Sequence, residues 1–342
     1  MNNMIVRRWY GIVLLWLITA PQAQAHVKWF VEFDIADPTL PLWQLLTPTL
    51  FLLLVLSGGG ILVSRYVDML WSSHQRFSLL PVLKTEYRDL PQTLLRVGTG
   101  VFFLVLWLIG GTILTPELTT DQPVIAGVQL PLALATFFRP LFPLVGLGIW
   151  GLYGFAVSQY GLFHMLDYVF FIALGAYFVL SGLNHRKLNP WRIDLFRWLV
   201  GFAFMWSAME KIVYPQWFDP FLDQYPFLQM GFHRDFFLLS AAWVELTLFY
   251  MIMRYHNGAA LIALLANLLV MTGNIYFGKI DAMGHFPANI MLLVITLVGN
   301  NKAVFWQQPT LRSAVCEVGR FLLTCGLILM LYYGLHWLEY GD

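Results

Sequence analysis

The chain has 342 residues, of which 59% are hydrophobic and only 11% are charged. Soluble domains carry about a quarter charged residues, so this composition excludes an ordinary soluble protein and predicts a polytopic membrane protein. The formal net charge of +1 gives no indication of nucleic-acid binding. The 2 cysteines form no CxxC or CxxCH motif, which argues against a dithiol relay, a c-type haem or an iron–sulfur cluster.

Residues 1–25 have the three parts of a secretory signal peptide: Arg7 and Arg8, a short apolar core, and the small-residue cleavage site AQA. An uncleaved first membrane helix is the alternative, but the core is short and Pro21 follows it. Cleavage makes His26 the N-terminal residue, and its amine and imidazole together can chelate copper. A lone histidine after a cleavage site is more often incidental.

Ten apolar stretches follow, each near the roughly 20 residues that an α-helix needs to cross a bilayer. The sequence therefore predicts an all-α, polytopic transmembrane helical bundle of about 10 spans after a cleavable signal peptide. The third stretch is the weakest, because it is short and Pro131 interrupts it. The predicted spans are 42–64, 95–114, 124–138, 141–158, 162–182, 195–213, 236–253, 258–277, 284–299 and 320–337.

The distribution of basic residues predicts the orientation of these spans. The chain has 20 lysines and arginines, and apart from the signal peptide nearly all lie in loops expected on the inner side. The outer segments hold only Lys28, Lys211, Arg234 and Lys279. Because ten spans return the chain to its starting side, we expect a multi-pass protein of the bacterial inner membrane with both mature termini in the periplasm.

The predicted organisation has five parts. They are a signal peptide (1–25), a periplasmic N-terminus with the first helix and a cytoplasmic amphipathic loop (26–93), a first four-helix unit (94–183), a second four-helix unit (194–300), and a cytoplasmic loop with the last helix (301–342). LLRVGTGVFF in the first unit matches LFRWLVGFAF in the second. Two parallel repeats related by an axis along the membrane normal are one interpretation. Chance similarity between apolar sequences is the other.

Ionisable residues inside the predicted spans are the main candidates for a functional site. A charge at mid-bilayer depth costs a few kcal/mol unless it faces the bundle interior and finds a partner. Glu210 and Lys211 close the span 195–213, and Glu245 lies in the middle of the span 236–253. We expect Glu245 to be sheltered among neighbouring spans as part of a buried polar pair with Lys211. This set is either a structural clamp or a catalytic, proton-carrying or substrate-binding site.

Residues 195–299 resemble the DoxX-like membrane proteins. That family is a four-helix bundle whose first helix ends in a Gly/Ala-x-x-Lys element and whose second helix carries a glutamate. The corresponding residues here are Ala208-Met209-Glu210-Lys211 and Glu245 within WVELTLF. Family members are linked to membrane redox chemistry, including thiosulfate:quinone oxidoreductase subunits and thiol-oxidant defence complexes. The resemblance implies a redox association, although the lack of cysteine pairs argues against a thiol role for this chain.

Two histidines form a second candidate site. His164 and His285 each open a predicted helix at similar outer depth, so a pseudo-twofold axis would bring them face to face. Asp281 precedes His285 by one helical turn and shares its face. Such histidines suit a metal ion or the axial positions of a b-type haem, and a quinone pocket would add aromatic walls such as Trp206 and Trp243. The simpler alternative is two interfacial histidines hydrogen-bonded to their neighbours.

The sequence favours one function and leaves two alternatives open. The favoured function is a quinone-linked, redox-associated membrane subunit that contacts the bilayer and a membrane or periplasmic oxidoreductase. The first alternative is a proton-coupled carrier for a small solute or metal ion, with Glu245 as the coupling carboxylate. The second is a non-catalytic membrane assembly protein. Whether the chain is an enzyme is left open by the residues themselves.

Overall fold

The computed structural model describes residues 27–73, 89–183, 191–254, 259, 262–265, 274–298 and 311–341, with side chains except at 27, 65–73, 274–281, 311, 312 and 314. Every regular element in these ranges is a helix, which confirms the all-α prediction. The elements are α2 (Val27–Phe30), η1 (Leu42–Leu45), α3 (Pro48–Ser73), α5 (Leu90–Ile109), α6 (Pro123–Gly127), α7 (Gln129–Ala135), η3 (Arg139–Leu141), α8 (Phe142–Tyr160), α9 (Leu162–Met165), η4 (Leu166–Tyr168), α10 (Phe170–Leu183), α11 (Trp191–Val213), η5 (Pro215–Phe218), α12 (Asp219–Gln224), η6 (Pro226–Gln229), α13 (Arg234–Met253), α15 (Asn274–Val298) and α16 (Leu311–Tyr340).

Several of these helices are long and apolar enough to cross a membrane. In the described part of the chain there are four: Leu90–Ile109, Arg139–Tyr160, Arg234–Met253 and Val315–Tyr340. A fifth is the pair Leu162–Tyr168 and Phe170–Leu183, which bends by 61° at its junction. The signal peptide and His26 lie outside the described residues, as does most of the predicted eighth span.

Two predicted spans differ from the helices that form. The stretch 124–138 is divided into α6 and α7, and the 13 residues Pro123–Ala135 are short for a bilayer. These helices nevertheless run back along α5. This is shown by Arg96, which lies near the start of α5 and donates to the carbonyls of Thr136 and Phe137 at the end of α7. The second difference is α15, a continuous helix over residues 278–283, where we predicted an outer loop between two spans.

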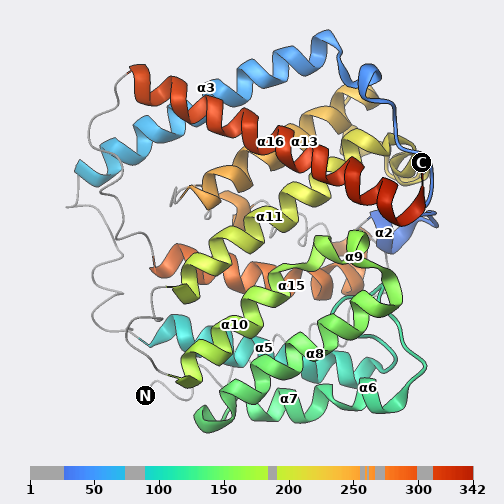
Figure 1. Ribbon diagram of the computed structural model, residues 1–342, viewed down its shortest axis with the longest axis vertical. Helices are drawn as coiled ribbons and strands as arrows, with labels where there is room; N and C mark the ends of the chain where they lie inside the picture. The colour runs from blue at the N-terminus through green and yellow to red at the C-terminus, as the bar shows by residue number, and fades with distance from the viewer. Residues whose placement is uncertain are drawn as a thin grey trace.

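The helices lie in a layered bundle in which most elements cross the molecule in the same general direction (Figure 1). The bent helix α10 packs against both α8 and α11, and α11 packs against α13. Helix α15 lies in the middle and touches α5 and α11, while α3 and α16 cross along one side. The two predicted four-helix units are therefore in direct contact through α10 with α11 and through α5 with α15.

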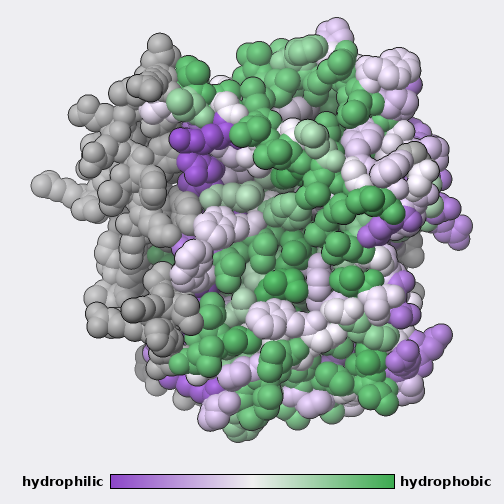
Figure 2. All heavy atoms as spheres, viewed as in Figure 1, coloured by the Kyte–Doolittle hydropathy of each residue, from purple (hydrophilic) through white to green (hydrophobic). Residues whose placement is uncertain are grey.

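The outside of the bundle is as apolar as its interior. Figure 2 shows hydrophobic side chains over much of the described part of one face, with hydrophilic residues gathered towards its margins. Val55, Leu323 and Met330, on α3 and α16, are each more than 60% exposed. Exposed apolar patches of this extent indicate contact with lipid or another apolar surface. The membrane prediction is thus supported by length, composition and surface together.

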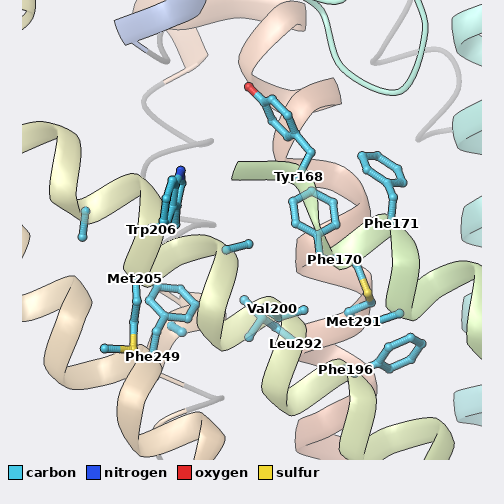
Figure 3. Packing of buried hydrophobic residues seen from close by; sticks show 14 of the residues in the cluster. Tyr168, Phe170, Phe171, Phe196, Val200, Met205, Trp206, Phe249, Met291 and Leu292 are labelled. Carbon is cyan, nitrogen blue, oxygen red and sulfur yellow. The ribbon is translucent and has the colours of Figure 1, made fainter. Parts of the chain in front are cut away.

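The core is made of large side chains that meet between α11, α13, α15 and the bend before α10. Figure 3 shows Met205 of α11 beside Phe249 of α13. Trp206 is fully buried, 4.7 Å from the ring of Tyr332 on α16. At the top of this view Tyr168 points its hydroxyl out of the apolar cluster, towards the polar groups described below. The apolar core therefore ends where the polar site begins.

Small residues let α8 and α10 approach closely. A methyl group at Gly146 would collide with the backbone carbonyl of Gly175, and one at Gly175 would collide with the indole of Trp150. The indole itself donates to the Ile172 carbonyl at 3.0 Å. Close backbone approach through glycine is the usual means of packing helices in lipid, where burial from water contributes little.

We predict that Gly146→Ala destabilises the detergent-solubilised protein, because the neighbouring backbone cannot move aside for the added methyl group. Overpacking of this kind costs about 1–3 kcal/mol, partly offset by the better helix propensity of alanine. Gly151→Ala in the same helix is the control, since nothing lies within 4 Å of the added atom. Thermal melts of both variants decide the matter, and equal melting temperatures would contradict the proposed close contact.

Candidate functional site

A buried lysine is the centre of the polar site. The Nζ of Lys28 lies 2.5 Å from Oδ2 of Asp167 and forms a second ion pair with Glu210. The three side chains are only 1–3% exposed. Ions buried this deeply cost several kcal/mol each unless they are paired, so the trio must be held in good geometry. When both carboxylates are ionised the trio carries one excess negative charge, which a proton can neutralise.

The lysine comes from a segment that we call the strap, residues 27–40, which runs over the end of the bundle. Its contacts reach both units and the last helix. The Trp29 indole donates to Tyr168 at 3.3 Å, and the Leu40 amide donates to the Val213 carbonyl at 3.1 Å. Asp37 accepts from Trp217 at 2.8 Å. The Ile35 and Leu40 carbonyls lie against His336 and Tyr333 of α16. The strap therefore ties elements that are far apart in the sequence.

A tight loop after α5 supplies a third carboxylate, that of Glu117. The loop folds back through paired backbone hydrogen bonds, Ile113 to Leu118 and Thr120 to Gly111, each 2.7 Å long. Gly110 and Gly111 both have positive φ angles, which glycine adopts without strain. The loop is fixed from α7 by Gln129, whose amide donates to the Thr112 carbonyl at 2.6 Å. Glu117 is thereby directed inward, with a side chain only 9% exposed.

Three polar residues of the site lie in the segment just before α10. Asp167 reaches Lys28, and His164 and Tyr168 reach Glu117. His164 and Asp167, three residues apart, and Tyr168 all lie in the short elements before α10. The Glu339 carboxylate of α16 accepts hydrogen bonds from the Leu162 and Phe163 amides, which fixes the start of α9. The segment that carries His164 and Tyr168 is bent by 61° from α10, and both side chains reach Glu117 in the loop after α5.

Glu117, His164 and Tyr168 form a hydrogen-bonded set. The imidazole Nε2 of His164 lies 2.9 Å from Oε1 of Glu117, and the Tyr168 hydroxyl donates to the same oxygen. Since Nε2 faces a carboxylate, it carries the proton of this contact. The ring of Phe33 from the strap lies parallel to the imidazole, with 8° between the planes and 6.2 Å between the centroids.

A cavity of about 630 Å³ opens beside this set. Its lining includes Lys28, Trp29, Phe33, Glu117, Tyr160 and His164. The volume falls within the range of small-molecule pockets, roughly 300–1,000 Å³, and the combination of aromatic walls with a few polar groups is typical of them. Because the strap forms one wall and the loop and α8–α9 form the others, the cavity exists only while the strap is in place.

The charges of the site act on two groups outside the apolar helices. Burial alone would lower the pKa of Lys28, but the negative charges of Asp167, Glu210 and Glu117 outweigh it and raise the pKa above its ordinary 10.5. Burial would raise the pKa of Glu117, but hydrogen bonds from His164 and Tyr168 and the charges of His164 and Lys28 hold it below its ordinary 4.5. Both groups are therefore ionised at neutral pH.

The predicted pair of Lys211 and Glu245 does form, at 2.9 Å, but it lies away from this centre. The Glu245 side chain is 32% exposed and that of Lys211 18%, so the pair is partly buried, far less so than the Lys28 trio. Glu210, next to Lys211 in the sequence, faces a different side of α11 and pairs with Lys28. Adjacent helical residues point about 100° apart, so the two neighbouring charges reach different partners.

The two histidines are not brought face to face. His164 lines the large cavity, whereas His285 lies against the Trp29 indole, 5.3 Å between ring centroids, beside a separate and much smaller cavity. No group of three His, Cys, Asp or Glu side chains in the described ranges could hold a metal ion. Of the other predicted metal ligands, His26 and the side chain of Asp281 lie outside those ranges.

The tryptophans that we expected to wall a pocket belong to the core. Trp206 packs against Phe163 and Tyr332, and Trp243 packs against Phe321 of α16. Neither lines the large cavity, whose aromatic walls come from Trp29, Phe33 and Tyr160. Sequence reasoning missed the strap because a lysine three residues after a predicted cleavage site carries no signal of burial. The three-residue spacing of His164 and Asp167, which places both on one helical turn, is a signal that could have pointed to this site.

No protein-family model, curated protein or solved structure matches this chain.

We predict that Lys28→Met strongly destabilises the protein, because it leaves two carboxylates facing each other in a buried site. Breaking a buried ion pair in this way costs about 3–5 kcal/mol. Lys211→Met is the matched control, since its partly exposed pair is worth about 0–1 kcal/mol. Thermal melts in detergent compare them. Equal losses would show that Lys28 is not the buried centre, and adding Asp167→Asn to Lys28→Met should recover part of the lost stability.

The pH dependence of stability should have two limits. The folded pKa of Glu117 is lowered, so its contribution is present above pH 4.5 and is lost as the pH falls through that lower value. The folded pKa of Lys28 is raised, so its contribution is present below pH 10.5 and is lost as the pH rises beyond it. We expect the difference in melting temperature between wild type and Glu117→Gln to be constant between these limits and to shrink in acid. A difference that is unchanged in acid would refute the assignment to Glu117.

Proposed function

We propose that this chain is a DoxX-like protein of the bacterial inner membrane and a redox-associated subunit that binds the head group of a quinone at the large cavity. The resemblance rests on the Ala208–Lys211 element and on Glu245. The 2.9 Å contact between Lys211 and Glu245 supports it, because the two charged residues that carry the resemblance meet in space. The chain would exchange electrons with a membrane or periplasmic oxidoreductase.

The proposed topology has a cleaved signal peptide, ten spans and both mature termini in the periplasm. The contacts of His336 with the Ile35 carbonyl and of Tyr333 with the Leu40 carbonyl support an even number of crossings, because they place the strap beside the end of α16. Figure 1 shows α2 and the C-terminus at the same side of the molecule. The return of α7 along α5 supports the third crossing.

One observation carries the quinone proposal: Glu117, His164 and Tyr168 form a hydrogen-bonded acid–base set at the edge of an aromatic-walled cavity. Interconversion of a quinone and its hydroquinone moves two protons with two electrons. A site for it therefore needs groups that exchange protons within hydrogen-bond reach of the ring oxygens. Trp29, Phe33 and Tyr160 provide flat apolar surfaces for the ring. The cavity is at the polar end of the bundle, where a membrane-anchored head group can enter from the interface.

A carrier remains the second candidate because of one feature, the excess negative charge of Lys28, Asp167 and Glu210. These groups come from the strap, η4 and α11, and so join the two predicted units. Two units that rock against each other would disturb this trio, and a proton taken up there would compensate the charge. The quinone proposal is preferred because the cavity adjoins the Glu117 set, whereas Lys28 already occupies both carboxylates of the trio.

The test is direct measurement of quinone in the purified protein. We expect solvent extraction to release a quinone, and a short-chain benzoquinone to quench tryptophan fluorescence in a saturable way. His164→Leu should weaken this binding several-fold, because it changes the cavity wall and removes the partner that orients Glu117. His233→Leu is the control, because that imidazole is 82% exposed and lies outside the cavity.

Two outcomes would contradict the proposal. If neither extraction nor titration detects a quinone, the cavity serves another ligand. If reconstituted vesicles show uptake driven by a pH gradient, and Asp167→Asn abolishes it while quinone binding is absent, the protein is a carrier.

A further inference from the structure

Most side-chain hydrogen-bond donors around the large cavity already have acceptors, whereas one carboxylate oxygen there has no partner among the described residues. Four lining residues have side-chain donors, and each already has an acceptor in the described part of the chain. Lys28 is bound by Asp167 and Glu210, and the Trp29 indole donates to Tyr168. The Tyr160 hydroxyl donates to the Thr119 carbonyl at 2.8 Å, and His164 uses Nε2 on Glu117. A ligand that brings only acceptors finds at most the third N–H of the Lys28 ammonium, whose side chain is 1% exposed.

The acceptors, in contrast, have spare capacity. Oε1 of Glu117 receives both His164 and Tyr168, whereas no donor among the described residues reaches Oε2. A buried carboxylate oxygen must be satisfied by water or by a ligand. The last torsion of a glutamate is broad and roughly two-fold, so either oxygen can turn towards the cavity that Glu117 lines.

From this asymmetry we propose that the cavity binds the reduced form of its ligand, a hydroquinone, in preference to the quinone. One ring hydroxyl donates to the Glu117 carboxylate and the other end of the ring lies among the aromatic walls. A quinone presents two carbonyl oxygens, both acceptors, and would face the carboxylate with repulsion. This inference rests on the proposed quinone function and names which redox form the site takes.

The state of Glu117 is consistent with this role. Its pKa is held below the ordinary value by the hydrogen bonds and charges described above, so the acceptor is ionised over the whole neutral range. Hydrogen bonds to a charged acceptor are stronger than those between neutral groups. The aromatic rings of Trp29, Phe33 and Tyr160 recognise the ring of either redox form, so discrimination falls to the polar contact alone.

The experiment is a pair of titrations of the purified, lipid-free protein with a short-chain benzoquinone and with its hydroquinone, kept reduced under argon. We expect the hydroquinone to bind at least tenfold more tightly. Glu117→Gln replaces one acceptor oxygen by an amide donor, so hydroquinone affinity should fall about tenfold or more while quinone affinity rises. Asp121→Asn is the matched control, because it removes a charge from the same loop outside the cavity and should leave the ratio unchanged.

The outcomes separate this inference from the proposed function. If neither form binds, the proposed function fails. If both bind but the quinone binds as tightly or more tightly, the quinone function stands and the hydroquinone preference is refuted. The wild-type ratio tests the preference even if Glu117→Gln does not fold. Benzylammonium, an aromatic cation, is a further test. If it displaces the bound hydroquinone when present at a lower concentration than the hydroquinone, the Glu117 carboxylate binds organic cations and the hydroquinone preference is refuted.

Discussion

The ammonium group of Lys28 sits between Asp167 and Glu210, and the geometry of this end of the bundle depends on the contact. Each of the three groups would be costly to bury alone. Together they can be buried only if the strap, the bend before α10 and the end of α11 keep a fixed relation. The apolar packing of the helices permits many small adjustments, but a buried ion trio does not. Its position therefore sets the positions of the elements around it.

The strap, held in place by Lys28, forms one wall of the cavity. Lys28 fixes its first turn, and the neighbouring Trp29 fits so closely over Gly284 that no side chain could be added there. From this anchor the chain continues across the end of the bundle, and Phe33 lies against His164. The cavity walls thus come from three separate parts of the chain, residues 28–33, residues 116–117, and Tyr160 with His164. Loss of the Lys28 ion pairs would therefore change the shape of the cavity, even if Lys28 itself does not touch a ligand.

Two polar networks meet at this place and have different characters. Lys28, Asp167 and Glu210 form an ionic network that faces the bundle interior and resembles a structural clamp. Glu117, His164 and Tyr168 form a hydrogen-bonded network that faces the cavity and is equipped for proton exchange. The Trp29 hydrogen bond to Tyr168 and the charge of Lys28 near Glu117 couple the two. The clamp gives the second network its fixed geometry and its ionised carboxylate, and this division of roles is the basis of the functional proposal.

The sequence by itself determined the helical class, the apolar character and the approximate positions of most helices, because periodicity and hydropathy act locally along the chain. It also identified Glu210 and His164 as unusual, since ionisable residues in apolar stretches need partners. It could not name those partners. The choice of Lys28 over Lys211 for Glu210, and of Glu117 over His285 for His164, was decided only by the tertiary structure. Those pairings depend on the 61° bend before α10 and on the path of the strap, which bring together residues 47 to 182 positions apart, and no local pattern encodes contacts at that separation.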